Sequence, residues 1–100
     1  LARAIRGLPT RARVHYNLGL LLQQLSRDAE AEEAMLTALE LEPDNLDYLY
    51  VLADYYLKRQ KFSKARQIAE QMVLKHPNNS IGRDILNFID ARTLNKDVRQ

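Results

Sequence analysis

The sequence predicts an all-α protein, a solenoid built from antiparallel pairs of helices. Three prolines, Pro9, Pro43 and Pro77, recur at intervals of 34 residues in a chain of 100 residues. A fixed period of this size is the sequence signature of a repeat array. Glycine is scarce, and the prolines stand between segments whose apolar residues recur at helical spacing. These observations together predict helices throughout.

The first repeat is expected to contain two helices. Apolar residues recur every three or four positions over 12–25, which indicates an amphipathic helix. Ser26 or Asp28 can then cap a second helix, which is expected to run to about Leu41. This helix should end before Pro43, because proline disfavours helical geometry at the residue that precedes it.

The second repeat follows the same plan. Asp44 or Asn45 can accept hydrogen bonds from the free amides at the start of a helix. Apolar spacing then predicts helices over 46–59 and 62–76, and Pro77 marks the end of the second one.

The last helix is expected over 80–93, followed by a polar, frayed tail at 94–100. Asn87 and Asp90 stand where the two repeats carry apolar or small packing residues. Polar residues suit a helix face with no following partner, so this helix is expected to be a C-terminal solvating cap. A truncated third repeat is the alternative.

At the other end, residues 1–11 are expected to be the final part of the second helix of a preceding repeat. Leu1, Ile5 and Leu8 would then leave an apolar edge exposed. We therefore expect further repeats or another domain upstream, or self-association of the chain through this edge.

The two units, 12–45 and 46–79, share small and apolar residues at matching positions. The first unit carries Leu18-Gly19, Ala31, Ala38 and Pro43, and the second carries Leu52-Ala53, Tyr56, Phe62, Ala65 and Pro77. This pattern resembles the tetratricopeptide repeat, although His15 and Leu49 stand where a tryptophan is usual. The resemblance implies a right-handed α-α superhelix. It also implies a non-catalytic scaffold or adaptor that binds another protein or peptide in a concave groove.

No catalytic or metal-binding constellation is found in the sequence. His15 and His76 are far apart, and the serines near helix starts, Ser26, Ser63 and Ser80, are expected to be caps and not nucleophiles. There is no cysteine and no glycine-rich phosphate loop, so we expect no enzyme, cofactor or metal. The net charge of +2 and the short apolar runs favour neither a nucleic acid nor a membrane partner. Cytoplasm and periplasm are equally compatible.

In an array of the kind that the resemblance implies, the first helix of each unit lines the groove. Helical spacing assigns ten residues to the predicted binding surface: Arg13, Tyr16, Asn17, Leu20, Gln24, Asp47, Tyr50, Asp54, Lys58 and Phe88. Val51, Ile81, Asp84 and Ile85 are expected beside them. The apolar members of this surface, Leu20, Val51, Ile85 and Phe88, could instead complete the core between repeats. Tyr16 and Tyr50, one repeat apart, are predicted to stack and to contact the partner.

Some relatives grip acidic C-terminal tails through a clamp of lysine, asparagine and arginine side chains, and this clamp is missing here. Asp47, Asp54 and Asp84 would repel a carboxylate tail. The expected ligand is therefore an extended or helical segment with apolar anchors and a basic residue.

Three alternatives stay open. The chain could be a C-terminal regulatory or assembly domain of a larger enzyme or redox protein whose chemistry lies upstream. It could be a helical-repeat RNA-binding protein, although the 34-residue period and the groove aspartates disfavour this reading. It could also self-associate through its N-terminal edge.

Overall fold

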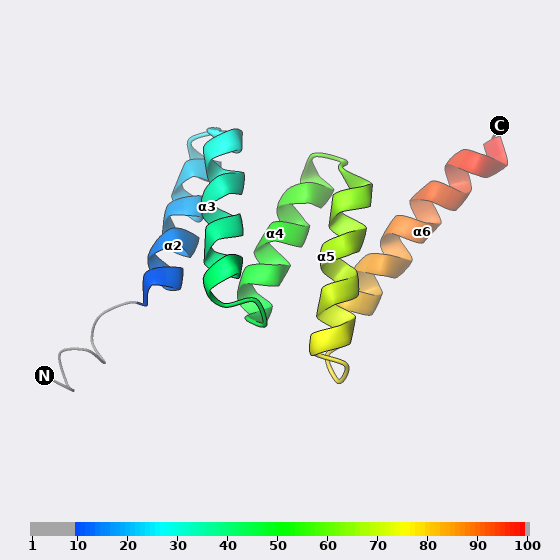
Figure 1. Cartoon of the computed structure of the whole chain (residues 1–100). Coiled ribbons are helices and arrows are strands. Elements are labelled where there is room, and N and C mark those ends of the chain that lie inside the picture. The colour runs from blue at the N-terminus through cyan, green and yellow to red at the C-terminus, as the bar shows by residue number, and fades with distance from the viewer. Residues whose placement is uncertain (1–9, 100) are drawn as a thin grey trace, which may run out of the picture. The chain divides into compact units, whose positions relative to one another are not determined.

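The chain is all-α, as predicted from its sequence (Figure 1). A computed structural model describes the backbone of residues 10–99 and the side chains of residues 10–93. The described helices are α2 (Arg11–Gln24), α3 (Asp28–Leu41), α4 (Leu46–Lys58), α5 (Phe62–Lys75) and α6 (Ile81–Arg99). No strand occurs within this part of the chain.

The helices belong to two compact units, Leu1–Tyr48 and Leu49–Gln100. Helix α2 packs antiparallel on α3 in the first unit, and α5 packs on α6 in the second (Figure 1). The boundary between the units falls inside α4, so its first turn contributes Tyr48 to the core of the first unit.

The predicted helix ends agree with the structure to within one or two residues, with one exception. Helix α6 continues past the predicted end at Thr93 as far as Arg99, so the prediction of a frayed tail is wrong over those residues. Apolar periodicity could not reveal this extension, because the added residues are mostly polar and continue the helix without an apolar stripe. Arg11, assigned to a preceding repeat, is the first residue of α2. The predicted edge residues Leu1, Ile5 and Leu8 lie outside the described residues.

Side-chain caps occur at the starts of α2, α4 and α6, the first helices of successive repeats. The hydroxyl of Thr10 accepts from the amide of Arg13 at 3.0 Å, and Asn79 Oδ1 accepts from the amide of Ile81 at 2.9 Å. At the start of α4, Asn45 Oδ1 accepts from the amide of Tyr48 at 3.2 Å. The cap predicted at Asn45 is therefore present.

Replacing Asn45 by alanine is expected to lower the free energy of unfolding by about 0.5–2 kcal/mol, the usual cost of removing an N-cap. The substitution also removes the bond from Asn45 Nδ2 to Glu42 Oε1, which measures 3.1 Å. Urea unfolding followed by far-ultraviolet circular dichroism would measure the change. Asn45→Ser keeps a capping oxygen and is the control, so equal losses in both variants would contradict the assigned cap.

At the starts of the second helices, α3 and α5, the N-cap residues are Arg27 and Lys61, and neither makes a side-chain cap hydrogen bond. The predictions that Ser26 and Ser63 are the caps are therefore wrong. Ser26 and Gln60 are one repeat apart and have positive φ angles of 60° and 58°. The amide of Arg27 donates to the Leu22 carbonyl at 2.9 Å, and the amide of Lys61 donates to the Tyr56 carbonyl at the same distance. These bonds close a Schellman turn at the end of each first helix. The preceding helix therefore fixes where the second helix begins.

Small residues set the spacing of the helix pair in the first unit. A Cβ added to Gly19 would lie 2.6 Å from Cγ of Met35 and 3.4 Å from the carbonyl oxygen of Ala31. Ala31 and Ala38 of α3 are completely buried, as the repeat pattern requires. Glycine at position 19 thus permits the close approach of α2 to α3.

An apolar stripe on α2 is exposed. Its members recur at helical spacing: Val14, Leu18, Leu21 and Leu25. One repeat later, Tyr48, Leu52 and Tyr55 of α4 stand in the registers of the first three and are buried.

Candidate functional site

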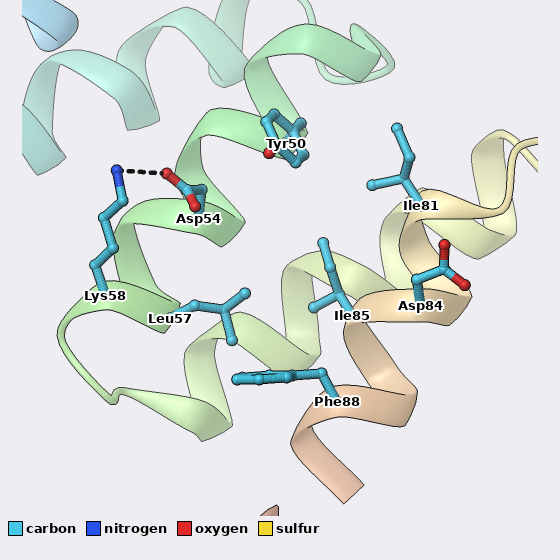
Figure 2. A pocket seen from close by; sticks show the side chains of 8 residues that line it. All are labelled: Tyr50, Asp54, Leu57, Lys58, Ile81, Asp84, Ile85 and Phe88. Carbon is cyan, nitrogen blue, oxygen red and sulfur yellow. Dashed lines mark ion pairs between the residues drawn. The ribbon is translucent and has the colours of Figure 1, made fainter. Parts of the chain in front are cut away.

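A pocket of about 610 Å³ lies between α4 and α6 in the second unit (Figure 2). Helix α4 contributes four of its lining residues, Tyr50, Asp54, Leu57 and Lys58, and helix α6 contributes Ile81, Asp84, Ile85 and Phe88. Each set is spaced by three or four residues, so each occupies one face of its helix. The volume is within the usual range for ligand pockets, roughly 300–1,000 Å³.

The walls of this pocket are apolar. Tyr50 and Phe88 are each 46% exposed, although the large apolar residues on the opposite face of α4 are buried. Figure 2 shows Leu57, Ile85 and Phe88 gathered at one end of the pocket, with Tyr50 and Ile81 toward the other. Scattered exposed apolar residues are ordinary, but a contiguous group around a hollow marks a surface suited to binding.

Three charged side chains line the same pocket. Lys58 Nζ lies 2.9 Å from Asp54 Oδ2, and the two residues are one helical turn apart on α4 (Figure 2). Asp84 is exposed, and no ion pair to its carboxylate is present among the described residues. Since Lys58 is paired with Asp54, the charge that remains for a bound ligand is the negative charge of Asp84.

The structure brings together four of the ten predicted binding residues: Tyr50, Asp54, Lys58 and Phe88. It also places Ile81, Asp84 and Ile85 beside them, which were expected on the same face. The sequence analysis missed Leu57. Its position seven residues after Tyr50, two helical turns along the same face, could have identified it.

Tyr16, which was predicted to stack with Tyr50, has an aromatic partner inside its own unit. Tyr16 stacks on Tyr48, with ring centroids 4.8 Å apart and an angle of 30° between the rings. Tyr48, Ala12 and Ala38 form the buried cluster of the first unit, and Tyr16 packs against it. Register alone could not show this, because the partner ring stands two residues before the position that matches Tyr16.

The other predicted binding residues lie in the first unit. The guanidinium of Arg13 lies 5.1 Å from the ring centroid of Tyr16 and 5.5 Å from that of Tyr48. This geometry suits a cation–π interaction, so Arg13 stabilises the tyrosine pair. Asn17, Gln24 and Asp47 are exposed, and Leu20 is half-buried.

Residues 10–93 contain no group of three or more histidine, cysteine or acidic side chains placed to hold a metal ion. Within the described part of the chain, no helix has both the length and the apolar character needed to cross a membrane.

Antiparallel helix pairs that recur every 34 residues, with buried alanines at matching positions, define a helical-repeat protein. A tetratricopeptide repeat family model matches residues 29–86, which is more than half of the chain. A second tetratricopeptide repeat model matches residues 12–45. The chain belongs to the tetratricopeptide repeat family, which confirms the resemblance seen in the sequence. Repeats of this family generally mediate protein–protein interactions and are generally non-catalytic.

Proposed function

We propose that this chain is a non-catalytic interaction module, a scaffold or adaptor that holds a segment of a partner protein in the pocket between α4 and α6. The observation that carries the proposal is the half-exposure of Tyr50 and Phe88 on facing sides of one apolar hollow. The other tyrosines of α4 are buried, and the partial exposure of these two rings adds no stability to the fold.

The pocket suits an apolar side chain of a partner. Complete burial of one leucine-sized side chain contributes about 1.5–3 kcal/mol. Tyrosine is also enriched among the residues that dominate binding energy at protein interfaces, because it combines a large apolar area with a hydroxyl group. One inserted anchor with flanking contacts on α4 and α6 would therefore give a specific but reversible complex.

Replacing Tyr50 or Phe88 by alanine is expected to weaken binding of peptides with a single large apolar residue at least tenfold, since about 1.4 kcal/mol corresponds to a factor of ten. Both side chains are partly exposed, so the fold should tolerate their loss. An array of synthetic peptides would identify binders, and fluorescence anisotropy would give their affinities.

The control is Leu74→Ala on α5. Leu74 is 71% exposed and does not line the pocket, so it tests whether loss of any exposed apolar side chain weakens binding. The proposed function fails if Tyr50→Ala and Phe88→Ala bind the same peptides as tightly as Leu74→Ala does.

A further inference from the structure

We infer that the partner segment carries a lysine or arginine beside its apolar anchor, and that Asp84 is the residue that selects it. This inference rests on the proposed function, since it concerns the occupant of the same pocket. It assigns to one carboxylate a preference for basic residues that the sequence could attribute only to several aspartates together.

The charges around the pocket are balanced except at Asp84. Asp54 and Lys58 form an ion pair of 2.9 Å, so their charges offset each other. Asp84 is the remaining charged residue of the lining, and its carboxylate has no ion pair in the part of the chain that the structure describes. A cation of the partner can therefore approach Asp84 without displacing an existing ion pair.

Asp84 lies within the first turn of α6. An acidic residue anywhere in that turn would interact favourably with the helix dipole. The acid, however, is on the pocket face, one turn after Ile81 and next to Ile85. The neighbouring Arg83 points elsewhere, since its Nη2 donates to the carbonyl of Pro77 at 3.2 Å. The positive charge is thus kept away from the pocket and the negative charge faces it.

Asp84 occupies a repeat position that is aromatic in the two preceding repeats. Tyr16 and Tyr50 occupy the same register in the two preceding first helices. In α6, the next helix of this series, a carboxylate stands in place of the aromatic ring, at the position where α6 borders the pocket. The pocket therefore combines the Tyr50 ring of α4 with the Asp84 carboxylate of α6, an arrangement complementary to an apolar side chain followed by a cation.

The expected change in peptide affinity depends on whether the charge of Asp84 is removed or reversed. An exposed ion pair contributes little, so loss of the Asp84 charge should weaken binding of a basic peptide by roughly two- to fivefold. Reversal of the charge should change the preference more, because a repulsive contact replaces an attractive one. We expect the ratio of affinities for basic and acidic peptides to change by roughly tenfold or more with Asp84→Lys.

The test uses three synthetic peptides that differ at one position. Each carries one large apolar residue, followed by lysine, glutamine or glutamate, and both ends are blocked so that no terminal charge contributes. Their affinities are measured by fluorescence anisotropy for the full chain and for Asp84→Asn and Asp84→Lys. Glu70→Lys is the control, because it changes the net charge equally at an exposed position outside the pocket. Circular dichroism verifies that every variant is helical.

The inference predicts that the full chain prefers lysine over glutamine and glutamine over glutamate. Asp84→Asn should remove this order and Asp84→Lys should reverse it, whereas Glu70→Lys should keep it. If the three peptides bind equally to the full chain, and Tyr50→Ala abolishes their binding, the charge inference is overturned and the proposed function stands. If Tyr50→Ala leaves their affinities unchanged, or if no peptide binds, the proposed function fails and this inference fails with it.

Discussion

Leu52→Ala is expected to lower the free energy of unfolding by about 2–5 kcal/mol, the usual cost of emptying a leucine site in a core. Leu52 is 0% exposed, so the truncation removes buried methyl groups and leaves a cavity that neighbouring side chains fill only in part. Urea unfolding followed by circular dichroism would measure the loss.

The matched control is Leu18→Ala, which changes the same residue type at the same position of the preceding repeat. Leu18 is 44% exposed on the α2 stripe, so its truncation should cost less than about 1 kcal/mol. Equal losses for the two variants would contradict the difference in burial. They would indicate that the α2 stripe is covered in solution.

Gly82→Ala is expected to lower the free energy of unfolding by about 1–3 kcal/mol, the usual cost of overpacking. In an exposed helix the same change would stabilise the protein by about 1 kcal/mol, because glycine is a poor helix former. A Cβ at position 82 would lie 2.9 Å from Cβ of Met72 and 3.0 Å from the carbonyl oxygen of Ala69. Neither atom is the end of a flexible side chain, so α6 would have to move away from α5.

The close contact is therefore tested by whether Gly82→Ala lowers or raises the free energy of unfolding. Asn87→Ala, at an exposed position of the same helix, is expected to leave stability unchanged or to raise it by up to about 0.7 kcal/mol. Urea midpoints of the two variants would be compared with that of the unchanged chain. A Gly82→Ala variant as stable as Asn87→Ala would mean that α5 and α6 are not in the close contact described.

Most of the secondary structure was predictable because its signals are local. Pro43 and Pro77 mark the repeat boundaries, and Asn45 supplies the cap that its position suggests. Errors arose where the type of a residue does not signal the backbone conformation that it adopts. The second helices begin after turns in which Ser26 and Gln60 adopt positive φ angles, and neither residue is the glycine that normally signals this conformation.

The candidate site was predictable in part. Helical spacing assigned Tyr50, Asp54, Lys58 and Phe88 to a common surface, and the structure places all four around one pocket. The same spacing could not distinguish Tyr50, which lines the pocket, from Tyr16, which packs on Tyr48. Periodicity reports which face of its own helix a residue occupies, and not which helix covers that face.

The sequence by itself determined the period, the helix pairs and the family, because proline spacing and apolar periodicity follow from the geometry of the backbone. Only the tertiary structure decided which apolar side chains are covered. Leu18 and Leu52 are the same residue at the same repeat position, and packing buries one and leaves the other exposed. It also decided that Asp84 of α6 borders the same pocket as Tyr50 of α4, whereas the ion pair between Asp54 and Lys58 follows from their spacing on one helix. Burial and the lining of a pocket depend on neighbours in space, and these are set when helices pack.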